Sequence, residues 1–304
     1  MRALSLPGCG CRGAFQIAVL RRLARRGEHF DLVAGASSGS ISGSAWVSGR
    51  AEVGPDLFRS MATTPVVSSR WLRREKSPFG MSAIVRDALE RLLPEADIAG
   101  SPIELLVATT RARALAHAAW SRLRHGPASS KAARDEQARA HASSSSRLHR
   151  EPHDAGRAQR GATLRDALVV HSNRTRSDMH DVIIASCTIP GVYARLPVLD
   201  GEIHVDGGAA DNTLLEALLA RGADDLTIIT PYVGGVVAQT LFDAERAPKV
   251  PRDVRLRVIS PLRTLSLGRF DFDPARLDEA LSMPHVEEIV SADGHAIETR
   301  IEAA

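Results

Sequence analysis

Short runs of apolar residues alternate along the chain with segments in which apolar residues recur at helical spacing. The first run is followed by such a segment at residues 13–26, and a second one begins after Ser38. We expect both segments to be helices. The runs that we expect to form strands are residues 3–6, 31–34, 103–109, 202–205, 226–230 and 254–259.

Strands and helices that alternate at this spacing are typical of an α/β protein, in which helices cover a mainly parallel sheet. In such sheets the active site lies at the carboxyl ends of the strands, where loops lead into helices. The polar and glycine-rich residues that follow the expected strands are therefore the first candidates for chemistry.

Residues 121–160 do not follow this pattern. They contain only two large apolar residues, Leu123 and Leu148, among seven serines, eight alanines and four histidines. So few apolar side chains cannot offset the entropy that is lost when forty residues become ordered. We interpret this segment as a disordered or loosely helical insert. The alternative is a charged surface helix over residues 128–142.

A G-x-S-x-G pattern follows the second expected strand and precedes the second expected helix. A serine at such a sharp strand-to-helix turn exposes its hydroxyl above the sheet, and small neighbours are needed because the backbone is pinched. This context favours Ser37 as a nucleophile in an elbow formed with Gly35 and Gly39. The alternative is a structural turn in which Ser37 caps the helix.

A glycine-rich loop follows the first expected strand and leads into the first helix. Its backbone N–H groups and the helix N-terminus favour a negative ligand, either a dinucleotide pyrophosphate or the oxyanion of a tetrahedral intermediate. A dinucleotide site also requires an acidic residue at the end of the second strand, but Asp31 stands at its beginning. The oxyanion is therefore favoured. The loop comprises Gly8, Cys9, Gly10, Cys11, Arg12 and Gly13.

A third motif, Asp206-Gly207-Gly208, follows the strand at residues 202–205. A carboxylate on a tight turn at a strand end can lie beside the serine of a neighbouring strand and act as its general base. Taken alone, the motif also fits an ordinary turn.

In this order, the three motifs resemble those of the patatin-like phospholipase family. Two further stretches resemble it as well, Ala-Ser-Cys-Thr-Ile-Pro at residues 185–190 and Asp211-Asn212. The resemblance covers about residues 2–232 apart from the insert. It implies a three-layer α/β/α fold and hydrolysis of acyl esters of lipids such as phospholipids or lysophospholipids. It also implies Ser37 as nucleophile, Asp206 as base and the glycine-rich loop as oxyanion hole, with no metal or other cofactor.

Cys9 departs from the family pattern, since it replaces the middle one of three consecutive glycines. Cysteine keeps the backbone N–H but restricts the backbone angles of the loop, which is expected to reduce activity. One rival hypothesis is therefore a catalytically weakened lipid-binding protein. Another is a Ser-His-Asp hydrolase, in which His285 or His295 completes the triad.

The chain of 304 residues carries 39 Lys and Arg against 36 Asp and Glu, and the segment 121–160 alone has a net charge of +5. The other 264 residues have a net charge of −2, so the basic balance lies in the insert, which we expect to contact an anionic membrane surface. Only twelve residues are aromatic, which argues against a stacking platform for nucleic acid.

Three cysteines form no disulfide framework, and the chain shows neither a Sec signal pattern nor a long apolar span. We therefore expect a cytoplasmic protein, with peripheral membrane contact at most. We expect one folded unit, in which residues 1–120 and 161–235 form the catalytic domain and residues 236–304 add a strand and helices to it.

Overall fold

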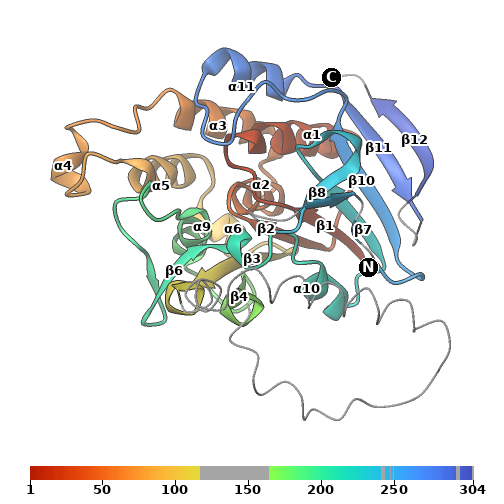
Figure 1. The fold of residues 1–304 in the computed structure, drawn as a ribbon, viewed down its shortest axis with the longest axis horizontal. Helices are drawn as coiled ribbons and strands as arrows, with labels where there is room; N and C mark the ends of the chain where they lie inside the picture. Colours follow the sequence, from red (N-terminus) through yellow and green to blue (C-terminus); the bar gives the residue numbers. More distant parts are fainter. Residues whose placement is uncertain (117–163, 241–243, 247, 249, 292–294, 303–304) are drawn as a thin grey trace, which may run out of the picture.

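The computed structural model describes residues 1–116, 164–240, 244–246, 248, 250–291 and 295–302. The segment 121–160, interpreted above as an insert, lies outside the described residues. A ten-stranded sheet crosses the molecule in the order β12-β11-β10-β7-β1-β2-β3-β6-β5, and β4 also pairs with β3 (Figure 1). The sequence motifs lie at the carboxyl ends of strands in the middle of this sheet.

Five adjacent strands at the centre of the sheet run parallel to one another. Four of them contain mostly fully buried residues, which is expected of strands covered on both faces. All five were predicted from the sequence to within about two residues at each end. They are β10 (Arg255–Pro261), β7 (Asp225–Ile229), β1 (Arg2–Leu6), β2 (Leu32–Ala36) and β3 (Glu104–Arg111).

Antiparallel strands extend the sheet at both edges. Of these, only β6 (Glu202–Asp206) was predicted, and the C-terminal part has more strands and fewer helices than expected. The C-terminal part also contains a separate two-stranded sheet, formed by β8 (Val236–Ala238) and β9 (Ala244–Arg246). The other antiparallel strands of the large sheet are β4 (Leu168–Ser172), β5 (Val198–Leu199), β11 (His285–Val290) and β12 (Ala296–Glu302).

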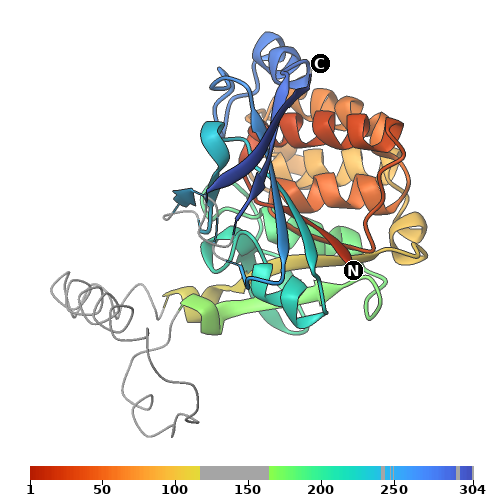
Figure 2. The ribbon, with the colours of Figure 1, turned by 90° about the vertical axis from the view of Figure 1, so that its right-hand side faces the viewer.

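Helices cover both faces of the sheet, and most of them lie on one face (Figure 2). The larger apolar core joins that face to its helices, and a second core joins the other face to α10 and β8. Alternate residues of each strand enter the two cores, as the geometry of a strand requires. The arrangement is a three-layer α/β/α fold, as expected. The longer helices are α1 (Gly13–Arg25), α2 (Ser38–Val47), α3 (Gly54–Ala62), α5 (Met81–Leu92), α9 (Met179–Cys187) and α11 (Pro274–Leu281).

Short helical turns connect these elements. The α-helical ones are α4 (Trp71–Arg74), α6 (Glu95–Ala99) and α10 (Leu215–Ala220). The 3-10 turns are η1 (Gly10–Arg12), η2 (Ala51–Val53), η3 (Leu164–Ala167), η4 (Gly207–Ala209) and η5 (Val233–Gly235).

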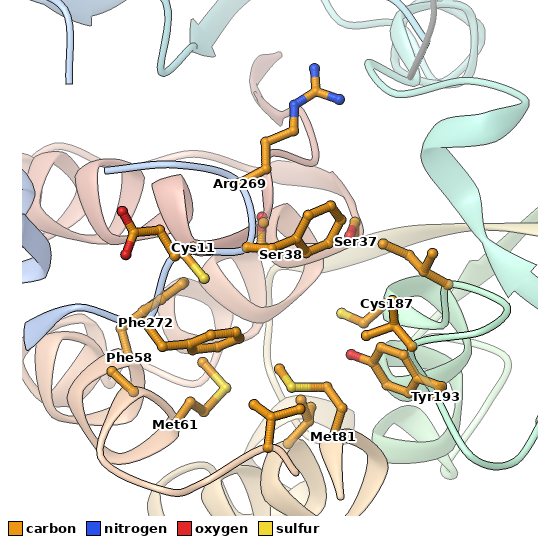
Figure 3. Close-up of a pocket in the computed structure, with 18 of the residues that line it drawn as sticks. Cys11, Ser37, Ser38, Phe58, Met61, Met81, Cys187, Tyr193, Arg269 and Phe272 are labelled. Atoms are coloured by element: carbon orange, nitrogen blue, oxygen red, sulfur yellow. The ribbon is translucent and has the colours of Figure 1, made fainter. Parts of the chain in front are cut away.

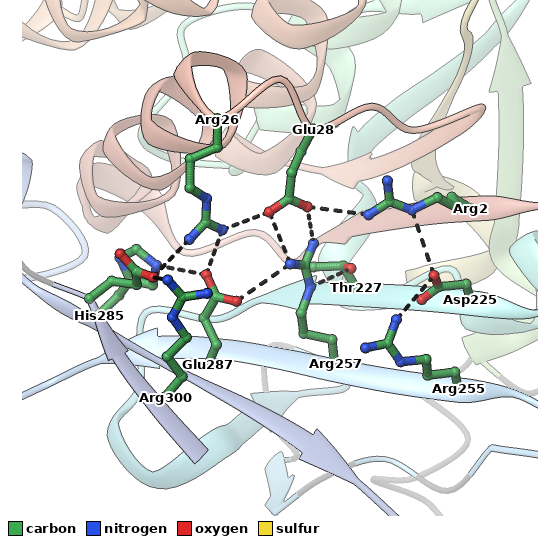
Figure 4. A network of polar contacts seen from close by, with 11 residues as sticks. Arg2, Arg26, Glu28, Asp225, Thr227, Arg255, Arg257, His285, Glu287 and Arg300 are labelled. Carbon is green, nitrogen blue, oxygen red and sulfur yellow. Dashed lines mark hydrogen bonds and ion pairs between the residues drawn. The ribbon is translucent and has the colours of Figure 1, made fainter. Parts of the chain in front are cut away.

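A network of ion pairs joins the end of α1 to the C-terminal strands (Figure 4). Arg257 of β10 binds Glu28 at 2.5 Å and Glu287 of β11 at 3.4 Å. Arg26 bridges the same two carboxylates, and Nε2 of His285 donates a hydrogen bond of 3.1 Å to Glu287. The network therefore holds the C-terminal strands against the N-terminal half of the fold.

Candidate active site

Ser37 stands between β2 and α2 with backbone angles of φ 51° and ψ −130°. A positive φ is rare for a residue with a side chain and costs free energy, so the surrounding structure must hold it. At Gly39 a Cβ atom would lie 1.8 Å from the carbonyl oxygen of Leu6, and at Gly35 it would lie 2.5 Å from the carbonyl oxygen of Gly39. The glycines therefore permit the close packing that keeps this turn sharp, which is the geometry of a nucleophile elbow.

Asp206 ends β6 and lies near Ser37 because of the strand register. Ala36 pairs with Ala108 of β3, and the next residue of β3, Thr109, pairs with Asp206. Neighbouring strands are about 4.8 Å apart, so Ser37 and Asp206 meet across the end of a single strand. At Gly207 a Cβ atom would lie 2.1 Å from the carbonyl oxygen of Ala108, which explains why a glycine follows the aspartate.

The carboxyl group of Asp206 is buried. One of its oxygens, Oδ1, accepts a hydrogen bond of 2.8 Å from the Gly208 N–H, and Oδ2 has no hydrogen-bond partner among the described residues. Burial raises the pKa of Asp206 to about 6, although the Ser37 hydroxyl, the Gly208 N–H and the charge of Arg269 favour the ionised form. The site therefore holds a buried carboxyl group whose pKa is raised towards neutral pH and whose Oδ2 is without a hydrogen-bond partner in the described part of the chain.

The amides of the glycine-rich loop are mostly engaged within the protein. The Gly8 N–H donates to Asn212 Oδ1 at 2.7 Å and the Cys9 N–H to Ser38 Oγ at 3.0 Å. The Cys11 N–H donates to the carbonyl oxygen of Arg269 at 2.9 Å.

The last amide of the loop, that of Gly13, donates to carbonyl oxygens of the loop itself. Gly10 lines the cavity described below, and its N–H has no hydrogen-bond partner among the described residues. Gly10 therefore combines a position on the cavity with an amide that the four bonded loop amides do not offer.

Two buried polar residues hold the candidate site together. Asn212 accepts from the Gly8 N–H and donates to the carbonyl oxygens of Gly8 and Ala238. Ser186 accepts a hydrogen bond of 2.8 Å from the Ser37 N–H. Both residues stand in stretches on which the family resemblance was based, but their contacts could not be read from the sequence.

A C-terminal segment, residues 265–272, covers the glycine-rich loop. Arg12 donates to the carbonyl oxygen of Leu267 at 2.8 Å and lies over the ring of Tyr232. Arg269 donates to the hydroxyl of Tyr232 at 2.7 Å. Arg12 thus links this segment to the glycine-rich loop. No sequence motif predicted the role of this segment.

An apolar cavity of about 280 Å³ begins at Ser37 and Ser38 and continues between α3, α5 and the segment after α9. Figure 3 shows the two serines at one end of it, and the guanidinium of Arg269 points away from the apolar side chains. Its volume is close to the lower end of the range for small-ligand sites. The lining residues include Ile41, Phe58, Met61, Val66, Val67, Phe79, Met81, Val85, Cys187, Ile189, Val192, Tyr193, Phe270, Phe272 and Leu277.

The family model for patatin-like phospholipase matches residues 4–219, which is most of the chain. The chain belongs to the patatin-like phospholipase family. This confirms the resemblance drawn from the sequence motifs, and with it the expected fold class. The matching solved structures include that of VipD from Legionella pneumophila, with 13% sequence identity and a TM-score of 0.38 over 95% of this chain and 68% of that one. No curated protein matches the chain.

The cavity of this patatin-like protein is lined by no histidine among the described residues. His285 is buried in β11, four strand positions away from β2, which is roughly 19 Å. Asp31, the acidic residue considered for a dinucleotide site, accepts a hydrogen bond from the Arg2 N–H just before β2, at the opposite end of that strand from Ser37.

In the described part of this family member, no three His, Cys, Asp or Glu side chains gather in a way that could hold a metal ion. None of the described helices is both long enough and apolar enough to cross a bilayer.

Proposed function

We propose that this protein hydrolyses acyl esters of lipids with Ser37 as nucleophile and Asp206 as general base. One observation carries the proposal. Ser37 occupies a strained elbow at the end of an apolar cavity, beside a buried carboxyl group whose pKa is raised to about 6. A serine that is activated by an adjacent base and faces an acyl-sized apolar space is the arrangement that acyl transfer requires.

In the first step, Asp206 Oδ2 takes the proton from Ser37 Oγ as that oxygen attacks the ester carbonyl carbon. The carbonyl oxygen then carries the negative charge. A base with a pKa near the working pH combines a large ionised fraction with a useful proton affinity, so a pKa of about 6 suits this role. The same group then gives the proton to the departing alcohol, which leaves an acyl-Ser37 ester.

Two amides are proposed to bind the oxyanion, those of Gly10 and Ser38. The residue after the nucleophile commonly supplies one donor, and Ser38 begins α2, where its N–H has no partner within the helix. Gly10 supplies the second donor, since the other loop amides named above are engaged. This assignment narrows the expected oxyanion hole, in which the whole Gly8–Gly13 loop took part.

In the second half of the reaction, water takes the place of the alcohol. Asp206 accepts a proton from the water, whose oxygen attacks the acyl carbon, and the proton then returns to Ser37 Oγ as the fatty acid leaves. Neither step needs a metal or an organic cofactor. The apolar cavity holds the acyl chain while this occurs, so the substrate class is a lipid ester such as a phospholipid or lysophospholipid.

The position of Cys9 supports a second candidate, a lipid-binding protein with weakened catalysis. The Cys9 N–H is bound to Ser38 Oγ and its side chain is buried beside that hydroxyl at 3.5 Å. Burial raises the pKa of the Cys9 thiol to about 12, so it acts as a neutral packing group. In this candidate the cavity binds the acyl chain of a lipid, and the ester is not hydrolysed.

A hydrolysis panel separates the two candidates. Phospholipid, lysophospholipid and triglyceride emulsions are offered to the wild-type protein and to Ser37→Ala, and released fatty acid is measured. Hydrolysis that is lost in Ser37→Ala supports the enzyme. Acyl-chain binding without release of fatty acid in the folded wild-type protein supports the binding protein, and equal hydrolysis by Ser37→Ala would refute the proposed nucleophile.

A further inference from the structure

Residues 66–80 form a loop that projects from the molecule, with α4 at its tip (Figure 1). Val67 and Phe79 of this loop line the cavity. Two backbone hydrogen bonds close the base of the loop, from Gly80 to Val66 at 2.8 Å and from Ser68 to Pro78 at 2.9 Å. Trp71 fills its interior and donates to the carbonyl oxygen of Pro65 at 2.9 Å. Trp71 also belongs to the larger apolar core, so it anchors the loop to the body of the protein.

Large apolar side chains are exposed on this loop and beside it. Val67 is 62% exposed, Phe79 38% and Phe270 61%, and all three line the mouth of the cavity. Leu72, on α4, is 53% exposed. Scattered apolar residues are common on surfaces, but a group at the entrance of an apolar cavity is typical of an interaction site.

The same loop is strongly basic. It carries four Lys or Arg and one Glu, a net charge of +3, whereas the 264 residues outside the segment 121–160 have a net charge of −2. Arg74 is bound to Asp87. Arg70, Arg73 and Lys76 are exposed and form no ion pair among the described residues.

We infer that this loop, together with Phe270, docks the protein on an anionic lipid bilayer. Exposed apolar side chains enter the interface while the cations meet the lipid head groups, and this combination gives peripheral binding. Because the apolar group is continuous with the cavity, a docked protein receives an acyl chain directly from the bilayer. The inference rests on the proposed function, and it places the membrane contact on the described loop instead of on residues 121–160.

Vesicle sedimentation tests the surface without any hydrolysis. Ser37→Ala is mixed with vesicles of equal parts phosphatidylcholine and phosphatidylglycerol, or of phosphatidylcholine alone. We expect stronger binding to the anionic vesicles, and a loss of affinity of about 100-fold when Arg70→Gln, Arg73→Gln and Lys76→Gln are added, since each basic residue contributes roughly fivefold. Leu72→Ser is expected to weaken binding about tenfold.

A matched control removes three exposed arginines from other elements. Arg113, Arg252 and Arg255 are changed to Gln, the last two on or just before β10, across the molecule from α4 (Figure 1). We expect this variant to bind the anionic vesicles nearly as well as Ser37→Ala. If it loses as much affinity as the loop variant, or if the loop variant binds normally, the docking surface is wrong.

A second measurement separates the docking surface from the catalytic proposal. With Ser37 intact, the three loop substitutions are expected to leave hydrolysis of a soluble short-chain ester unchanged and to lower vesicle hydrolysis severalfold or more. Loss of both activities would show that the loop supports the fold and would overturn its role in docking. Vesicle binding without any hydrolysis by the wild-type protein would instead refute the proposed function and leave the surface intact.

Discussion

The backbone N–H of Ser37 donates a hydrogen bond of 2.8 Å to the hydroxyl of Ser186. Ser186 is fully buried in the last turn of α9, and Thr188, just beyond this helix, accepts a hydrogen bond of 2.8 Å from the Asp206 N–H. One short segment therefore holds both residues of the proposed dyad. It accounts physically for the stretch at residues 185–190 that the sequence shares with the family.

Ser186→Ala tests whether this bond positions the nucleophile. The substitution leaves a buried N–H without a partner, which costs about 1–3 kcal/mol of stability, and it frees the strained turn. We expect kcat to fall about tenfold with little change in KM. Ser44→Ala is the control, since Ser44 is equally buried but binds a carbonyl oxygen of its own helix. Equal effects of the two substitutions on kcat would argue against a positioning role.

The pH dependence of hydrolysis is expected to follow Asp206. Since burial raises its pKa to about 6, the base is ionised above that pH, and kcat/KM is expected to fall as the pH drops below about 6. The positive charge of Arg269 favours the ionised form, so Arg269→Gln is expected to move this limb to higher pH. The measurement is a pH–rate profile with a soluble ester.

Arg276→Gln is the matched control for that shift. Arg276 lies near the same C-terminal segment but pairs with Asp271 at 2.6 Å, and it is not among the groups that change the pKa of Asp206. Its profile is expected to coincide with that of the wild-type protein. If the acid limb of the pH–rate profile lies at the same pH in Arg269→Gln as in the wild-type protein, a group other than Asp206 controls it.

Asp206→Asn is expected to raise stability while it abolishes activity. A raised carboxyl pKa means that the folded protein binds this proton more tightly than the unfolded chain does. The contribution of protonated Asp206 to the stability of the folded protein is therefore complete below about pH 4, and it is lost as the pH rises through 6. At pH 8 the ionised, buried group costs roughly 1–3 kcal/mol. Chemical unfolding at pH 8 and pH 4 is expected to show the gain only at pH 8, and a loss at pH 8 would contradict it.

The ion-pair network is expected to make stability depend on pH in the opposite sense. Burial opposes ionisation of Glu287, but hydrogen bonds from His285 and Arg26 outweigh it and lower its pKa to about 2. Its contribution is therefore complete above about pH 4.5 and is lost as the pH falls towards 2. Arg257→Met is expected to cost about 2–4 kcal/mol at pH 7, and less in acid.

Arg300→Met is the control for the network. The side chain of Arg300 is 68% exposed and pairs with Glu302 at the edge strand β12, so its removal is expected to cost less than about 1 kcal/mol. Urea unfolding at pH 7 measures both variants. A loss for Arg257→Met no larger than that for Arg300→Met would show that the network adds little to stability.

The candidate catalytic residues could be predicted because their requirements are local. A sharp turn needs glycines at fixed sequence positions relative to the serine, and the close approach of β3 requires a glycine at Gly207. The sequence motifs therefore predict this local geometry. The central strands were likewise visible as apolar runs.

The cavity and the segment that closes it could not be predicted in this way. Phe58, Met61 and Val85 line the cavity but have the same spacing as core residues of a helix. The segment at residues 265–272 binds the glycine-rich loop through the carbonyl oxygens of Leu267 and Arg269, which any residue type can supply. Glu287 lies in β11, a strand whose polar residues resemble exposed ones, yet it is buried and forms ion pairs.

The most direct test of the account is to trap the nucleophile. The protein is treated with a fluorophosphonate probe, and the modified peptide is located by mass spectrometry in the wild-type protein, in Asp206→Asn and in His285→Gln/His295→Gln. We predict modification of Ser37, a labelling rate at least 100-fold lower in Asp206→Asn, and an unchanged rate in the histidine variant. Labelling of another residue, or a rate that depends on the histidines and not on Asp206, would contradict the Ser37–Asp206 dyad.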